Sequence, residues 1–162
     1  CKPRYGGRLK RVSDGLLKPN TRRTLMRQYG KAAVDAVGLI QAGISPKKAW
    51  IQAISQYTKS EHSRKKVCPR NAFLGLCAAG MIVGVDSRHP ELIGLKNDNG
   101  DYAIDAIKLL RQDKFLQQEI MSGKKISEEI LDNWWKQISN TPGTPQDQLH
   151  IVMALWQKGL IV

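Results

Sequence analysis

The chain has 162 residues, a formal net charge of +12 and a hydrophobic content of 41 %. A chain of this length can be stable without disulfides or a structural metal, and its three cysteines lack the spacing of a zinc site. Because no apolar run resembles a signal peptide or a membrane span, we expect a cytoplasmic protein with reduced thiols and no membrane contact.

Residues 1–25 carry eight Lys or Arg and one Asp, together with glycines, prolines and almost no apolar periodicity. This composition predicts a flexible basic arm. Two interpretations of the arm stay open. It is either an extension that binds nucleic-acid phosphates, or a non-native leader upstream of a natural start at Met26.

The rest of the chain repeats three blocks in the same order. The paired blocks are Ala33–Ile40 with Ala103–Leu110, Trp50–Ser55 with Trp134–Ser139, and Ala72–Val83 with Ile151–Val162. Such repetition predicts an all-α fold built from a tandem duplicated helical unit with two pseudo-symmetric halves. We expect a first repeat at 26–83, a linker at 84–100 and a second repeat at 101–162, with 26–162 packed as one globular domain.

The first repeat is expected to begin with two helices. Apolar residues three and four apart predict a helix from about residue 24 to 42, which Gly43 ends. Ser45 then serves as a cap, and Pro46 takes the first position of a helix that reaches about residue 57.

Two further helices complete this repeat. Thr58 and Glu61 have the spacing of a capping box, which predicts a short basic helix over 59–66. Cys68 and Pro69 end it and begin an apolar helix that stops at Gly80.

The second repeat is expected to hold helices at 101–112 and 113–122, with a stop at Gly123, and then a helix capped by Ser127. A turn at 141–143 and a cap at Thr144 precede the last helix, which ends at Gly159. The apolar segments 81–83 and 160–162 hold equivalent positions, so we expect them to pair as a two-stranded antiparallel ribbon.

Positive charge is also concentrated in residues 26–83, which carry nine Lys or Arg against two acidic residues, whereas 84–162 carry nine against eleven. The helix at 71–79 is too apolar to read a DNA groove and is assigned to the core. A basic face of the first repeat is therefore the candidate site for the DNA or RNA backbone, without base specificity, and a merely solvated face is the alternative. Its residues are Lys47, Lys48, Lys59, Arg64, Lys65, Lys66 and Arg70.

Other chemistry finds little support in the sequence. Cys68 follows several cations at a helix start, a setting that lowers a thiol pKa, and His62 is a conceivable partner for a nucleophile. The cysteines and histidines do not have metal-ligand spacing, and we expect no metal or cofactor. The four tryptophans are assigned to the core, and Trp135 beside Lys136 is the one candidate for base stacking.

The run Cys68–Ile82, together with residues 29–36, Ala49-Trp50 and residues 154–161, resembles a small bacterial family of unknown function with the motif CP-x-x-AFLGLC-x-x-G-x-I. The resemblance covers residues 26–162 and leaves 1–25 outside. It implies a bacterial protein that begins near Met26, and it supplies no activity or catalytic residues. Families of this kind are often carried on mobile gene cassettes.

Three function hypotheses follow. The first is a non-enzymatic binding or adaptor protein with weak, salt-sensitive affinity for the nucleic-acid backbone. The second is a protein-interaction module or homodimer with no nucleic-acid role. The third is a thiol-dependent enzyme that uses Cys68.

Overall fold

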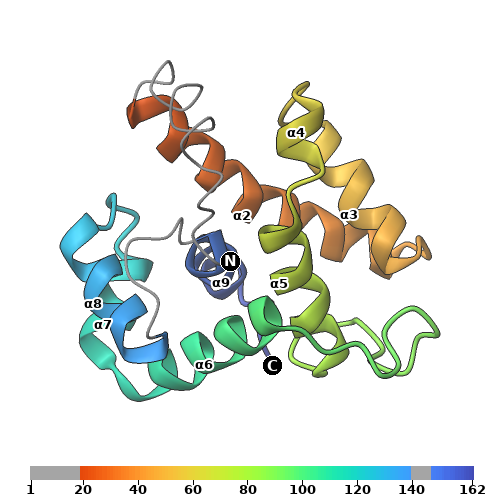
Figure 1. Cartoon of the computed structure of the whole chain (residues 1–162). Coiled ribbons are helices and arrows are strands. Elements are labelled where there is room, and N and C mark those ends of the chain that lie inside the picture. Colours follow the sequence, from red (N-terminus) through yellow and green to blue (C-terminus); the bar gives the residue numbers. More distant parts are fainter. Residues whose placement is uncertain (1–18, 140–146) are drawn as a thin grey trace.

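The described part of the protein is built from helices (Figure 1). The computed structural model describes residues 19–139 and 147–162, with the backbone alone for 19–26. The helices are α2 (Pro19–Gln41), α3 (Pro46–Ser55), α4 (Glu61–Arg64), α5 (Val67–Ala78), α6 (Asp98–Gln112), α7 (Lys114–Met121), α8 (Glu128–Ile138) and α9 (Asp147–Gln157). The predicted all-α fold is confirmed.

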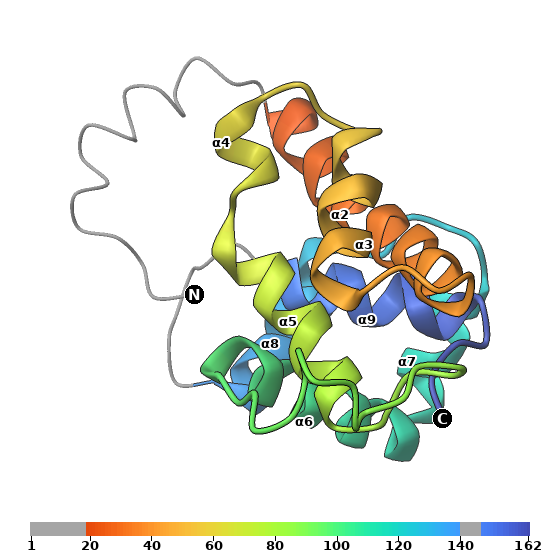
Figure 2. The ribbon, with the colours of Figure 1, turned by 90° about the vertical axis from the view of Figure 1, so that its right-hand side faces the viewer.

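The last helix, α9, lies in the middle of the molecule, and α2, α5 and α6 pack around it. Figure 2 shows α9 between α2, α3 and α4 on one side and α6, α7 and α8 on the other. A helix that is apolar on most of its circumference has to be buried. The buried residues of α9 are Asp147, Gln148, Leu149, Ile151, Val152, Met153 and Leu155.

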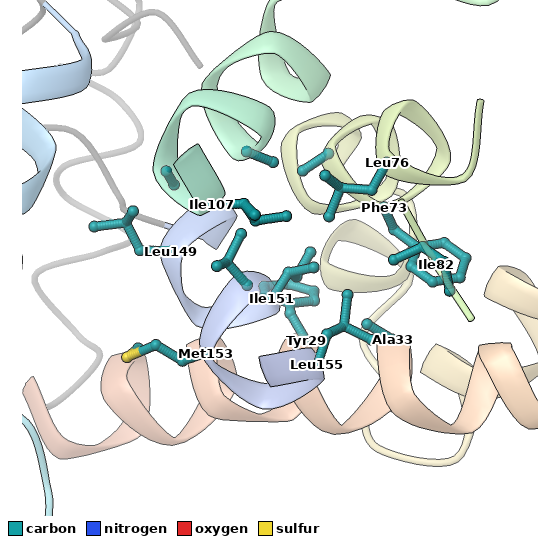
Figure 3. Packing of buried hydrophobic residues seen from close by; sticks show 14 of the residues in the cluster. Tyr29, Ala33, Phe73, Leu76, Ile82, Ile107, Leu149, Ile151, Met153 and Leu155 are labelled. Atoms are coloured by element: carbon teal, nitrogen blue, oxygen red, sulfur yellow. The ribbon is translucent and has the colours of Figure 1, made fainter. Parts of the chain in front are cut away.

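The core contains residues of both halves. Figure 3 shows Ile151 and Leu155 of α9 among side chains from α2, α5 and α6, including Tyr29, Phe73 and Ile107. As the sequence predicts, α5 belongs to this core, since its residues 72–77 are all buried.

Tryptophans attach the outer helices to this core. Trp50 of α3 stacks on Phe73 of α5 with 5.5 Å between ring centroids. Trp135 of α8 meets Tyr102 of α6 edge-on at 5.3 Å. Trp135 is only 2 % exposed, so its predicted place in the core is confirmed and the alternative of base stacking is excluded.

The helix ends follow the sequence closely. Gly80 and Gly159 both adopt a positive φ, +73° and +67°, which glycine tolerates best. Past each glycine the chain turns back, so that the amide of Met81 donates to the Leu76 carbonyl and that of Leu160 to the Leu155 carbonyl. The predicted stops at Gly43 and Gly123 are confirmed in the same way.

The predicted antiparallel pairing of 81–83 with 160–162 is confirmed as a single bridge, without strands in the described residues. Ile82 and Ile161 form an antiparallel bridge, flanked by hydrogen bonds from Val83 N to Leu160 O (2.8 Å) and from Val162 N to Met81 O (2.9 Å). The bridge joins the segment that follows α5 to the segment that follows α9.

Two helix starts differ from the expectation. α2 begins at Pro19 and not near residue 24, so residues 19–25 of the expected arm are helical, while residues 1–18 lie outside the described residues. α6 begins at Asp98, three residues early, because the Asn97 side chain accepts from Gly100 N at 2.7 Å and caps the helix.

Two predicted helix caps differ from the structure, and a third lies outside the described residues. Ser60 and not Thr58 caps α4, by accepting from Ser63 N at 3.3 Å. The Ser45 side chain makes no capping bond to α3. The linker residue Glu91 accepts from Lys47 N at 3.1 Å instead. The expected turn at 141–143 and the cap at Thr144 lie outside the described residues.

The cap at Ser127 is confirmed, since its hydroxyl accepts from Ile130 N at 3.2 Å. α5 begins at Val67, one residue before the predicted start at Cys68 and Pro69.

Two close helix crossings connect the halves. A Cβ added to Gly75 of α5 would lie 2.5 Å from the Gly100 Cα of α6, and one added to Gly30 of α2 would lie 2.8 Å from the Ala154 Cβ of α9. In the register of the predicted repeat, Gly30 corresponds to Gly100 and Ala154 to Gly75. The duplication itself stays a prediction.

We expect Gly30→Ala to lower the free energy of unfolding by about 1–3 kcal/mol, since its methyl group would overlap the His150 carbonyl and Ala154. Gly38→Ala, in the same helix, is the matched control. Nothing lies within 4 Å of its added Cβ, so it should raise stability by about 0.5–1 kcal/mol. Urea unfolding measures the free energy of unfolding of both variants. Equal effects would contradict a close contact of α2 with α9 at Gly30.

Candidate functional site

The basic residues singled out in the sequence do not form one compact cluster. Lys47 and Lys48 lie in the first turn of α3, whereas residues 59–66 follow its other end, about 15 Å away along the helix. Arg70 is half-buried on α5. We call residues 59–66 the basic segment.

Within the basic segment, Lys65 and Lys66 form ion pairs of different kinds. Lys65 Nζ lies 2.7 Å from Glu61 Oε1, and both side chains are more than 70 % exposed. Lys66 Nζ lies 2.7 Å from Asp147 Oδ2, and the Asp147 side chain is completely buried. Solvent weakens the first pair, whereas the second compensates a buried charge.

Tyr29 of α2 completes the surroundings of the buried pair. The Lys66 ammonium lies 5.7 Å from the centre of the Tyr29 ring, a distance at which a cation is attracted to the ring face. The Tyr29 hydroxyl donates to the Ser63 carbonyl at 3.0 Å. Burial and, next, the charge of Asp147 raise the pKa of Tyr29 well above its usual range, so it stays a proton donor. We call Tyr29, Lys66, Asp147 and His150 the junction cluster.

The first turn of α9 contributes further buried polar groups. Gln148 Nε2 donates to Asn99 Oδ1 at 2.8 Å. Within the described ranges, Gln148 Oε1 and His150 Nε2 are buried and have no hydrogen-bond partner. The pKa of His150 is lowered to about 4, because burial outweighs the opposing charge of Asp147 and Arg27 adds a smaller lowering, so this imidazole is neutral at pH 7.

Sequence reasoning missed the junction cluster. Neither Asp147 nor His150 is among the candidate residues that the sequence provides. The available signal was the order Asp-Gln-x-His at the start of an apolar helix, where polar side chains have to be buried together with it. The identity of the partner lysine could not be read from that order.

The charge asymmetry of the sequence becomes an asymmetry in space. Helices α2, α3 and α4 lie on one side of α9, and α6, α7 and α8 lie on the other (Figures 1 and 2). We call the first of these the basic side. Its exposed cations are Arg27, Lys31, Lys47, Lys48, Lys59 and Lys65.

Both carboxylates of residues 26–83 are engaged by neighbours. Asp35 accepts a short hydrogen bond from the Tyr57 hydroxyl, which raises the pKa of Tyr57 to about 12. Glu61 is paired with Lys65, and the hydrogen bond from that lysine lowers the pKa of Glu61. Arg27 and Lys31 were missing from the sequence-based site, although their spacing of four residues places them on one face of α2.

Neither Cys68 nor Cys77 is placed as a reactive thiolate. Cys68 is disulfide-bonded and 7 % exposed, so the expectation of reduced thiols does not hold for it. Cys77 is a buried free thiol, and burial raises its pKa to about 12. His62, the conceivable partner of Cys68, is exposed on α4.

Among residues 19–139 and 147–162, no three His, Cys, Asp or Glu side chains converge as metal ligands would. In the same ranges, no helix combines the length and the apolar character that crossing a membrane requires.

We expect Lys66→Met to lower the free energy of unfolding by roughly 3–5 kcal/mol, because it leaves the buried Asp147 carboxylate uncompensated. The double variant Lys66→Met/Asp147→Leu should recover most of that loss, since no buried charge remains. Urea unfolding of the two single variants and the double variant measures the coupling. Additive effects would show that the pair does not form in solution.

Stability should also fall as the pH decreases from about 6.5 to about 4. The native imidazole of His150 resists protonation, whereas the unfolded chain takes up a proton below its ordinary pKa of about 6.5. The loss attributable to His150 reaches about 3 kcal/mol near pH 4 and levels off below that pH. His150→Gln should flatten this part of the stability profile, and an unchanged profile would contradict the burial of a neutral imidazole.

Comparison with known proteins identifies a family but no activity. No curated protein and no solved structure matches the chain. Residues 26–162, which include all of the junction cluster and the exposed cations of the basic side, match the family of unknown function DUF6979. The expected membership in a family of unknown function over these residues is thus confirmed, and the chain belongs to the DUF6979 family.

Proposed function

We propose that the protein is a non-enzymatic binding protein whose basic side binds the phosphate backbone of DNA or RNA. The observation that carries this proposal is the group of exposed cations on α2, on α3 and in the segments that flank α4. The two carboxylates of residues 26–83, Asp35 and Glu61, are already engaged by Tyr57 and Lys65. A side with this charge attracts a polyanion and releases its counterions on binding.

Binding of this kind positions the nucleic acid without reading its bases. Base readout in the major groove needs an exposed helix or ribbon with polar side chains. α5, which follows the basic segment, instead buries Phe73, Leu74 and Leu76 in the core. We therefore propose affinity for duplexes of any sequence.

The competing proposal is self-association. α6 and α8 carry exposed carboxylates at Asp98, Asp105 and Glu129. The basic side of one copy could face these residues of a second copy, and such a contact would be heterologous. Sedimentation velocity of the protein alone, at about 50 mM and about 300 mM salt, separates the two proposals. Only self-association predicts a larger species at the lower salt concentration.

The full chain should bind a duplex of about 20 base pairs with an affinity that falls steeply as salt rises. The variant Lys59→Glu/Lys65→Glu should weaken this binding at least tenfold at low salt, because it replaces two cations of the basic side with anions. Fluorescence anisotropy with two unrelated duplex sequences measures both effects.

The matched control is Lys124→Glu/Lys125→Glu, in the loop between α7 and α8 on the opposite side of α9. It changes the net charge of the protein by the same amount. Equal weakening by both double variants would show that binding responds to total charge, and would overturn the proposed site. A wild-type chain that binds no duplex would overturn the proposed function.

A further inference from the structure

The ammonium group of Lys66 points into the protein, although Lys66 lies in the basic segment. Its Nζ atom lies 2.7 Å from Asp147 Oδ2 and 5.7 Å from the centre of the Tyr29 ring. The Asp147 side chain is 0 % exposed and that of Lys66 is 29 % exposed. The positive charge of Lys66 thus compensates the buried carboxylate of Asp147.

The neighbouring Lys65 gives a direct comparison. Its pair with Glu61 lies in solvent, with both side chains more than 70 % exposed, so it can open at little cost when a phosphate approaches. The pair of Lys66 cannot open in the same way. If the ammonium moved out to a phosphate, the carboxylate of Asp147 would remain buried without a counter-charge.

The chain around Lys66 also restricts its movement. α4 has four residues, too few for a helix that is stable alone, and α5 begins directly after Lys66. Three residues before Lys66, the carbonyl of Ser63 accepts from the buried Tyr29 hydroxyl. Contacts to α2 and α9 therefore fix the backbone on which the Lys66 side chain is mounted.

We infer that Asp147 competes with phosphate for Lys66, so that the basic side offers one cation fewer to nucleic acid than the sequence of the basic segment suggests. This inference rests on the proposed function for its consequence in binding. It assigns Asp147 of α9 the role of withholding Lys66 from phosphate on the basic side.

The first experiment tests the pairing itself and needs no nucleic acid. The folded full chain is treated briefly with acetic anhydride, and fragment-ion mass spectrometry assigns the modification to individual lysines. We expect Lys66 to react at least fivefold more slowly than Lys65 in the wild-type chain. In Asp147→Asn, which keeps the shape of the side chain but removes its charge, the rate of Lys66 should approach that of Lys65.

The second experiment counts phosphate contacts through the dependence of duplex affinity on salt. Each cation that neutralises a phosphate contributes about 0.9 to the slope of log K against log salt concentration. Lys59→Met should reduce the slope by about that amount, whereas the neutral pair Lys66→Met/Asp147→Asn should leave it unchanged. Asp147→Asn alone should increase the slope by up to about 0.9, because Lys66 becomes available.

The outcomes separate the inference from the function on which it rests. Equal acetylation rates of Lys65 and Lys66 in the wild-type chain would overturn the inference whatever the protein binds. A slope lowered by the neutral pair as much as by Lys59→Met would also overturn it, since Lys66 would then contact phosphate. A chain that binds no duplex would overturn the proposed function and the role of Asp147 in binding, while slow acetylation of Lys66 would still report the buried pair.

Discussion

The arrangement of the molecule depends on backbone contact at two helix crossings. α2 meets α9 where Gly30 faces Ala154, and α6 meets α5 where Gly100 faces Gly75. At both crossings a larger residue on either helix would push the axes apart, because the nearest atoms belong to backbone or to a Cβ. α2 thus packs against α9 and α6 against α5, and α9 comes to lie in the middle.

This placement of α9 creates the polar junction. With α9 held against α2, Asp147 is buried beside Tyr29 and Lys66 and has to be compensated there. The crossing also lets the segments after α5 and α9 meet at Ile82 and Ile161. The ion pair of Lys66 with Asp147 and the bridge between Ile82 and Ile161 therefore follow from one packing arrangement and lie at opposite ends of α9.

The features that the sequence predicted correctly are those with local causes. A glycine at a helix end, such as Gly80 or Gly159, acts through its own backbone freedom, and the apolar segments that follow can be recognised by composition. The residues that were predicted wrongly have interaction partners far along the chain. Ser45 was expected to cap α3, but the bond comes from Glu91, and Lys66 was expected to face solvent, but it is bound to Asp147 81 residues later. Such contacts depend on how helices pack, and no local pattern records them.

The position of α9 has a consequence for how the chain folds. The helix that fills the centre of the core is also the last of the described helices in sequence. On a ribosome, α2, α5 and α6 emerge before the helix against which all three bury their apolar faces. The contacts of α2 with α9 span more than 100 residues, so closing the core is a late, long-range step. Until that step, the apolar faces of α2, α5 and α6 that pack against α9 in the folded protein stay exposed to solvent.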